Sequence, residues 1–225
     1  FALDRAGLVG ADGPTHHGVL DISYLRAIPN LVVAAPRDEN ELERLLATAL
    51  AGDAPFALRF PRGAAPGVAP DPDPSPIPVG RAEILREGDD VALVGIGRTV
   101  GVAQEAAERL SKRGIEASVI DARFVKPLDV RTLARIARRT GALVTVEDHV
   151  KMGGFGSAVL EGLAEHAPGV VVRVLGLGDH FVEHGDVEAQ RRDAGIDPDS
   201  VATTTEELLD GLAARSRRGA GIASS

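Results

Sequence analysis

The feature that most constrains the fold is a repeated alternation of short apolar runs with segments of helical periodicity. Four runs in the C-terminal two thirds are each long enough for a strand: residues 91–94, 117–120, 142–146 and 171–175. Continuous apolar runs are typical of strands buried on both faces, and their alternation with helices indicates a mostly parallel sheet with right-handed crossovers. We therefore predict an α/β fold with flanking helices near residues 99–112, 128–139, 156–166 and 204–216.

The N-terminal part carries one further unit of the same kind. An apolar run at residues 31–35 is followed by Asp38, a plausible helix N-cap, and by a periodic segment that ends at Gly52. Residues 55–60 then indicate a second strand. One β-α-β unit within residues 1–63 is too little for a complete doubly wound domain, so we expect only part of a domain here.

A proline-rich segment separates the two parts. Residues 64–78 contain six of the 14 prolines of the chain. Proline fixes φ and removes a hydrogen-bond donor, which excludes a helix or a central strand. We predict a partial domain over 1–63, a linker over 64–78, a C-terminal domain over 79–216 and a flexible tail over 217–225.

Charge and composition exclude several classes of function. The formal net charge is −8 and no long basic run occurs, so we expect no nucleic-acid partner. The longest uncharged stretch, residues 27–36, is about half of the ~20 residues that a membrane span needs. The absence of cysteine rules out disulfides and thiolate metal sites. No secretory signal is visible at the start, and we expect a soluble, cytoplasmic protein.

The densest group of chemically active residues lies between Asp4 and Gly18. Asp12 and His16 stand near Arg5 in this segment, and Arg62 follows the second strand. A histidine can exchange a proton near neutral pH, and arginine presents a fork of donors to a phosphate or carboxylate. His16 and its neighbour His17 should point in different directions. The alternative is a purely structural loop, and a metal site is a weaker hypothesis because the spacing of the histidines does not suit one.

Two other clusters are open to a functional or a structural interpretation. The glycines at 95, 97 and 101, with Asp121 after the next strand, approximate a dinucleotide fingerprint but depart from its spacing, and tight packing explains them as well. Glu147, Asp148 and His149 follow a strand where ligands bind in open parallel sheets. They could perform acid–base chemistry or form an interface between domains.

Several long motifs occur in order along the chain: DRAGLVG at 4–10, DGPTHHG at 12–18, YLRAIPN at 24–30, FPRG at 60–63, RFVKPLD at 123–129, EDH at 147–149, GGFGSAV at 153–159 and FVEHG at 181–185. Together they closely resemble the 1-deoxy-D-xylulose-5-phosphate synthase family, whose architecture is similar to that of transketolase. The resemblance extends from residue 1 to about 213.

The resemblance implies a thiamine-diphosphate-dependent transferase. Enzymes of this family use thiamine diphosphate and Mg²⁺ to decarboxylate pyruvate and join the two-carbon unit to D-glyceraldehyde 3-phosphate, forming a precursor of isoprenoids, thiamine and pyridoxal. By resemblance, Arg5 and Arg62 would bind the phosphate or hydroxyls of the aldehyde, while Asp12 and His16 would contact the reacting carbons and relay protons. A homodimer is also implied.

The sequence departs from the family in one important respect. It contains no Gly-Asp-Gly motif for the diphosphate and metal, and it lacks the family's upstream activating glutamate. The chain therefore resembles the second half of a pyrimidine-binding domain followed by a transketolase C-terminal-like domain. We assign no metal ligand or cofactor-binding residue and expect no activity from this chain alone. The alternatives are the C-terminal subunit of another thiamine-diphosphate enzyme that needs a partner chain, or a dinucleotide-binding module.

Overall fold

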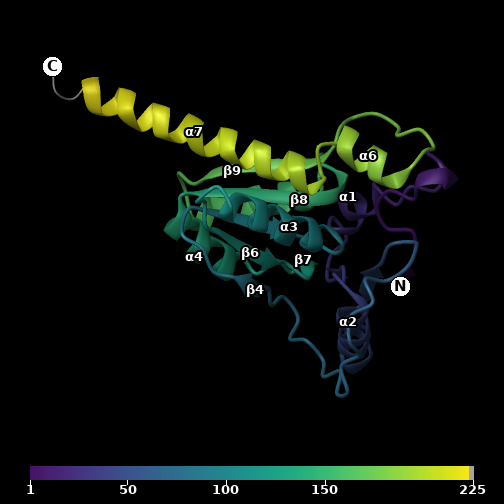
Figure 1. Cartoon of the computed structure of the whole chain (residues 1–225). Helices are drawn as coiled ribbons and strands as arrows, with labels where there is room; N and C mark the ends of the chain where they lie inside the picture. Colours follow the sequence, from purple (N-terminus) through teal and green to yellow (C-terminus); the bar gives the residue numbers. More distant parts are fainter. Residues whose placement is uncertain (223–225) are drawn as a thin grey trace.

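Two β-sheets form the framework of the molecule in the computed structural model, which describes residues 1–222 (Figure 1). The larger sheet has the strand order β4-β6-β5-β8-β9. Its strands are β4 (Glu83–Arg86), β5 (Val91–Gly95), β6 (Ala117–Asp121), β8 (Ala142–Val150) and β9 (Val171–Leu177). All neighbouring strands pair in parallel except β4 and β6. The four apolar runs are therefore strands of a mostly parallel sheet, as the sequence predicts.

Helices cover both faces of this sheet, and a hydrophobic core fills each interface. The four main helices are α3 (Thr99–Ser111), α4 (Val130–Thr140), α5 (Phe155–His166) and α7 (Pro198–Ile222). Helices α4 and α5 pack together over a core that includes Ile136, Phe155 and Val94, whereas α3 and α7 share a second core with Leu110 and Val201. The alternation of the buried apolar side chains of β5 between these two cores explains why its sequence is continuously apolar.

The N-terminal sheet is smaller and has the order β1-β3-β2-β7. Strands β1 (Ala2–Leu3), β2 (Val32–Ala34) and β3 (Phe56–Arg59) pair in parallel. Helix α2 (Glu39–Ala51) joins β2 to β3, and the carboxylate of Asp38 accepts a hydrogen bond from the Glu41 amide at 2.8 Å, which confirms the N-cap. The fourth strand, β7 (Phe124–Lys126), pairs antiparallel with β2. The C-terminal part of the chain thus completes the N-terminal sheet.

The proline-rich segment lies against α2 and contains no helix or strand. The Glu39 carboxylate accepts hydrogen bonds from the backbone amides of Gly67 and Val68 at 2.8 and 2.9 Å. Near the end of the segment, Ile77 is buried, and its amide donates a hydrogen bond to the Thr48 hydroxyl at 2.7 Å. These contacts fasten the segment to the N-terminal part on its way to β4.

The remaining short elements are the 3-10 helix η1 (Gly10–Asp12) and the helices α1 (Asp21–Leu25) and α6 (Val187–Asp193). Helix α7 differs from the sequence-based expectation because it runs to Ile222, inside the tail predicted over 217–225. Arg217, Arg218 and Ala220 are strong helix formers and favour this continuation, whereas Gly219 and Gly221 disfavour it. Residues 223–225 of that tail lie outside the described residues. Over the described part of the chain, none of the helices combines the length and the apolar character of a membrane span.

Candidate functional site

A closed backbone loop presents the residues between β1 and α1. The amide of Gly18 donates to the carbonyl oxygen of Arg5 at 3.0 Å, the Gly7 amide donates to the Gly18 oxygen at 2.8 Å, and the Ala6 amide donates to Phe60 at the end of β3. A Cβ atom on Gly18 would lie 2.3 Å from the Arg5 oxygen, so only glycine fits at this crossing. Arg5 itself has a φ of 57°, in the left-handed region. Arg5 therefore lies at the point where the two ends of the loop are hydrogen-bonded together.

Asp12 joins two arginines from separate segments. Its Oδ2 lies 3.4 Å from Nε of Arg5 and forms an ion pair with Nη1 of Arg62, which follows β3. Partial desolvation raises the pKa of Asp12, but hydrogen bonds and attraction from Arg62 and Arg5 outweigh it and hold the pKa below its usual value. The side chains of Arg5 and Arg62 keep 42% and 50% of their surface exposed. Their remaining donors are therefore accessible to an anion from solution.

The two adjacent histidines point to different surroundings, as their spacing predicts. His16 is exposed, and its Nδ1 lies 2.9 Å from the Thr15 hydroxyl. His17 is partly buried, and its Nδ1 accepts a hydrogen bond from the Val9 amide at 3.0 Å. A neutral His17 then carries its proton on Nε2, a buried atom with no partner among the described residues. His17 thus braces the loop from inside, whereas His16 faces outward.

Of the four residues singled out in the sequence, the structure brings three into direct contact: Arg5, Asp12 and Arg62. His16 belongs to the same loop, and its backbone amide donates to the Gly13 oxygen at 3.0 Å. No contact within hydrogen-bond distance joins the His16 ring to the other three in the described part of the chain. The exposed donors of Arg5 and Arg62 can bind an anion, and the same loop carries the exposed imidazole of His16.

Sequence reasoning overlooked a buried ion pair beneath the loop. Arg59, 4% exposed, donates to both carboxylate oxygens of Asp21 at 2.8 and 3.2 Å and to the Gly18 carbonyl oxygen at 3.0 Å. A bidentate pair of this kind fixes both position and orientation. The available signal was the occurrence of a charged residue, Arg59, within an otherwise apolar strand. This pair supports the crossing from which Arg5 projects.

Glu147 caps a helix rather than facing an open cleft. The side chain is fully buried, and its carboxylate accepts the backbone amides of Phe155 and Gly156, in the first turn of α5, at 2.6 and 2.9 Å. Burial raises the pKa of Glu147 to about 7, although the two amides act in the opposite direction. Glu147 therefore holds the start of α5 against the end of β8.

Asp148 and His149 bind the N-terminal part of the chain to the larger sheet. The Leu8 amide donates to Asp148 at 3.0 Å, and the Ile22 amide donates to Nε2 of His149 at 3.0 Å. His149 Nδ1 lies 2.8 Å from the Val150 oxygen, so the neutral ring carries its proton there. Burial above all, together with the cationic environment, lowers the pKa of His149 to about 4. These contacts favour the interface over acid–base chemistry.

The glycine-rich turn at the end of β5 serves close packing. A Cβ atom on Gly95 would lie 2.6 Å from Cα of Val100 in α3. Asp121, the acidic residue of the approximate dinucleotide motif, is buried and bound to Arg37 at 2.9 Å and to the Arg123 amide at 2.9 Å. Both observations favour the packing interpretation. Within residues 1–222, no group of three or more histidine, aspartate or glutamate side chains could hold a metal ion.

Comparison with known proteins identifies relatives over nearly the whole chain. The chain is 54% identical over 210 residues to 1-deoxy-D-xylulose-5-phosphate synthase 1 of Geobacter sulfurreducens, covering 93% of this chain and 33% of that protein. It is 51% identical over 210 residues to the synthase of Heliobacterium modesticaldum, covering 93% and 32%. The chain therefore spans about a third of the length of the curated relatives it matches.

Solved structures share the same fold. A structure described as "Split gene transketolase, inactive beta4 tetramer" superposes with a TM-score of 0.75 at 31% identity, covering 93% of this chain and 65% of that chain. Transketolase from Campylobacter jejuni superposes with a TM-score of 0.66 at 22% identity, covering 92% and 31%, and at this identity it supports the fold alone.

Two family models match the chain. The model described as the pyrimidine binding domain of transketolase matches residues 1–67, and the model described as the transketolase C-terminal domain matches residues 80–201. The second match alone covers more than half of the chain, and the sheets and helices have the arrangement of a solved transketolase. The chain belongs to the transketolase family.

Proposed function

We propose that this chain is the C-terminal portion of a 1-deoxy-D-xylulose-5-phosphate synthase. Such an enzyme decarboxylates pyruvate and transfers the remaining two-carbon unit to D-glyceraldehyde 3-phosphate. The proposal rests on one observation above all: Arg5 and Arg62, from separate segments, converge on Asp12 in a partly exposed cluster. The 54% identity to the Geobacter synthase over this region supports it.

The arrangement of the cluster suits an anionic sugar substrate. Asp12 neutralises part of the charge of two guanidinium groups and fixes their separation. A phosphate presents more oxygen acceptors than one carboxylate and forms charge-assisted bonds with both arginines. We assign the phosphate or the hydroxyls of the aldehyde to Arg5 and Arg62. The affinity of the cluster for the aldehyde then comes mainly from these charge-assisted bonds.

Asp12 and His16 are assigned to proton handling near the reacting carbons. The pKa of Asp12 lies below its usual value because the attraction of Arg62 and Arg5 outweighs desolvation, so it is an acceptor at neutral pH. His16 is exposed on the same loop, and its imidazole can donate or accept a hydrogen bond. In this assignment Asp12 also holds the arginines in place before the substrate arrives.

Thiamine diphosphate supplies the electron sink for the decarboxylation when it is bound. The resemblance assigns its diphosphate and Mg²⁺ to a Gly-Asp-Gly motif that this sequence does not contain. We propose that segments outside this chain hold most of the cofactor and that the chain supplies one wall of the substrate pocket.

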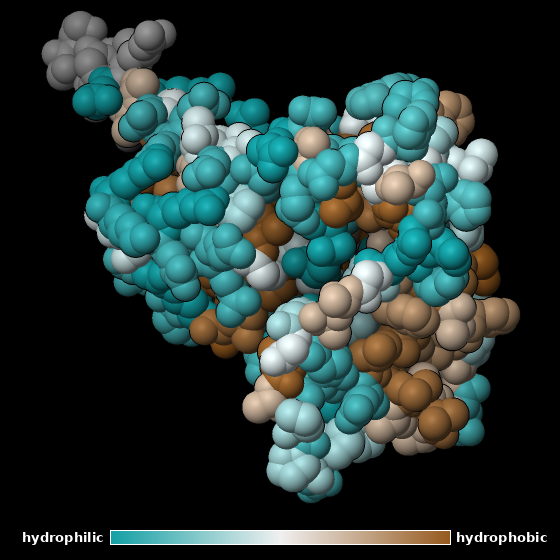
Figure 2. Space-filling view, turned by 45° about the vertical axis from the view of Figure 1, so that its right-hand side comes forward, coloured by the Kyte–Doolittle hydropathy of each residue, from teal (hydrophilic) through white to brown (hydrophobic). Residues whose placement is uncertain are grey.

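An exposed apolar surface on the N-terminal part supports the docking of further protein. Figure 2 shows apolar side chains gathered over this part of the molecule. Leu46 and Leu50 on α2 are 50% and 80% exposed, and Phe1, which precedes the edge strand β1, is 80% exposed. A patch of this kind is typical of a protein interface. We propose a cytoplasmic homodimer for the complete synthase.

A second candidate function is a separate subunit that docks on a partner chain with the cofactor site. The observation in its favour is the structural similarity to a protein described as a split gene transketolase. Both candidates place the same cluster in the active site. They differ in whether the segment carrying the cofactor site is covalently attached.

A chimeric enzyme tests the synthase proposal. We would join the N-terminal two thirds of the Geobacter sulfurreducens synthase to this chain and measure product formation from pyruvate and D-glyceraldehyde 3-phosphate with thiamine diphosphate and Mg²⁺. We expect turnover from the chimera and none from this chain alone. Adding the same N-terminal segment as a separate polypeptide tests the second candidate. A folded chimera that is inactive with the aldehyde phosphate would contradict the synthase proposal.

A further inference from the structure

A pocket of about 420 Å³ lies between the N-terminal part and the start of α3, beside the cluster described above. Most of its wall is apolar, and its single contribution from the larger domain is Arg98. Its lining includes Pro36, Leu42, Phe60, Pro61, Ala64 and Arg98, together with the charged residues Arg37, Asp38 and Glu39. A mostly apolar cavity with a few polar groups is the common form of a site for a small molecule.

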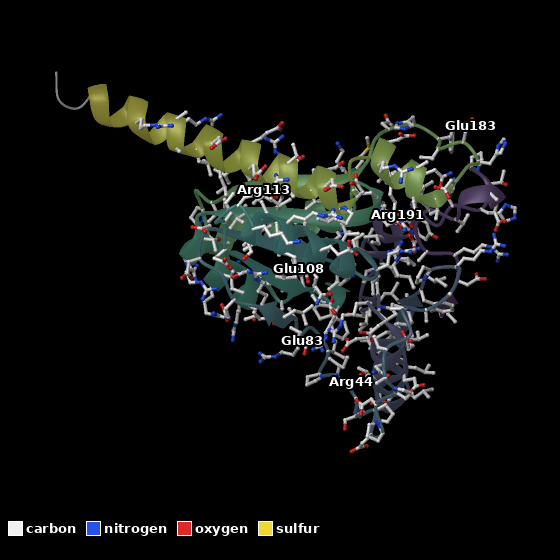
Figure 3. All side chains as sticks on the ribbon, in the orientation of Figure 1. Arg44, Glu83, Glu108, Arg113, Glu183 and Arg191 are labelled. Carbon is white, nitrogen blue, oxygen red and sulfur yellow. The ribbon has the colours of Figure 1, made fainter. Side chains whose placement is uncertain are left out.

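The other charged side chains on the wall are occupied by partners of their own. Arg37 bonds to Glu83 at 2.5 Å and to Asp121 at 2.9 Å, and Figure 3 shows Glu83 at the junction of the larger domain with α2. Asp38 caps α2, and Oε1 of Glu39 accepts the amides of the proline-rich segment, whereas Oε2 of Glu39 is buried and has no hydrogen-bond partner among the described residues. Arg37 and Asp38 therefore need no partner from a ligand, and Glu39 leaves one acceptor oxygen free.

Arg98, in contrast to Arg37, forms no ion pair over residues 1–222. It is partly buried, and within the described residues no carboxylate lies within 4.0 Å of its guanidinium group. Burial and the nearby positive charge of Arg191 lower the pKa of Arg98, and the weaker attraction of Asp148 and Glu188 does not compensate. A partly desolvated arginine whose neighbouring carboxylates all lie beyond ion-pair distance is unfavourable, and an anion in direct contact with it would relieve this cost.

Arg98 also connects the pocket to the loop of the candidate site. It lines a second, small cavity together with Ala6 and Gly7 of that loop and with Asp148. Phe60 and Pro61 of the larger pocket directly precede Arg62. A ligand against Arg98 would therefore lie next to the segments that carry Arg5 and Arg62, in a pocket that Arg5 and Arg62 do not line.

We propose that this pocket is a second binding site, which takes a small amphipathic anion. The apolar body of the ligand packs against Leu42, Phe60 and Pro61, and its carboxylate or phosphate pairs with Arg98. The site is distinct from the aldehyde site and does not depend on the proposed synthase activity. Its charge requirement is one oxyanion, because Arg37, the other cationic residue of the wall, is already paired with Glu83 and Asp121.

Binding to the purified 225-residue chain tests the proposal directly. Isothermal titration would compare benzoate, phenyl phosphate and the neutral benzyl alcohol, which share an aromatic body. We expect saturable binding of at least one anion, at least tenfold tighter than that of benzyl alcohol, and weaker at higher salt. The comparison of benzoate with phenyl phosphate identifies the preferred oxyanion.

Three variants decide where the anion binds. Arg98→Met should weaken binding of that anion at least tenfold, whereas Arg131→Met, which removes an equal charge from an exposed position on α4, should change it less than twofold. Ala64→Phe fills the pocket, keeps Arg98 and should also abolish binding. Circular dichroism would verify that each variant is folded. Absence of saturable anion binding, equal affinity for benzyl alcohol, or binding unaffected by both Arg98→Met and Ala64→Phe would overturn the proposal.

Discussion

Replacing Asp21 with asparagine removes the counter-charge of Arg59 while keeping the size of the side chain. Both residues are less than a tenth exposed, and two hydrogen bonds join them at 2.8 and 3.2 Å. Leaving one member of a buried pair uncompensated costs about 3–5 kcal/mol. We expect Asp21→Asn to lower the free energy of unfolding by that amount, a large part of the total for most domains.

Urea unfolding followed by circular dichroism measures this loss, with Asp199→Asn as the control. Asp199 pairs with Arg109 at 3.3 Å, but its side chain is 77% exposed, so its replacement should cost less than about 1 kcal/mol. The double variant Asp21→Leu/Arg59→Met removes both charges and should be more stable than Asp21→Asn alone. A loss below about 1 kcal/mol for Asp21→Asn, or a double variant no more stable than that single variant, would refute the reasoning.

Two further predictions concern the same interface. Because burial lowers the pKa of His149 from 6.5 to about 4, its stabilising contribution is complete above pH 6.5 and is lost as the pH falls towards 4, by about 3 kcal/mol at most. Urea unfolding should show that the difference in the free energy of unfolding between the wild type and His149→Phe becomes smaller as the pH falls over this range. A constant difference would contradict the conclusion that His149 is neutral in the folded chain. Gly7→Ala should destabilise the chain far more than Gly141→Ala: φ is similar at the two positions, but a Cβ atom at Gly7 lies 2.5 Å from Asp148 Oδ2, whereas none lies within 4 Å at Gly141. An equal decrease in Tm for the two variants would show that Asp148 moves away from the new Cβ atom without loss of stability.

The regular elements of the larger sheet could be predicted from the sequence because their signal is local. Each apolar run became a strand, and the helix at 99–112 was observed as Thr99–Ser111. Strand β7 could not be predicted in this way. It has only three residues, and its partner Val33 lies about 90 residues earlier in the chain, so tertiary pairing rather than local preference forms it.

In the candidate site, too, features with a local sequence signal could be predicted, whereas features formed by distant contacts could not. The residue types and the nearby glycines indicated a ligand-binding loop, and the contacts of Asp12 with Arg5 and Arg62 are consistent with that hypothesis. The role of His149 could not be resolved from the sequence, because its decisive partner is the Ile22 amide, 127 positions away. The buried pair beneath the loop was missed for a similar reason, since its two members are far apart in the chain.

The central claim is that Arg5 and Arg62 bind the phosphate of the aldehyde substrate, and steady-state kinetics of the chimeric synthase test it most directly. Arg62→Ala should raise the KM for D-glyceraldehyde 3-phosphate at least tenfold and leave the KM for pyruvate within about twofold, because a charge-assisted contact is worth about 1.5–3 kcal/mol. D-glyceraldehyde without the phosphate should show no such difference between the two enzymes. Equal increases in both KM values, or an equal effect on the unphosphorylated aldehyde, would contradict the claim.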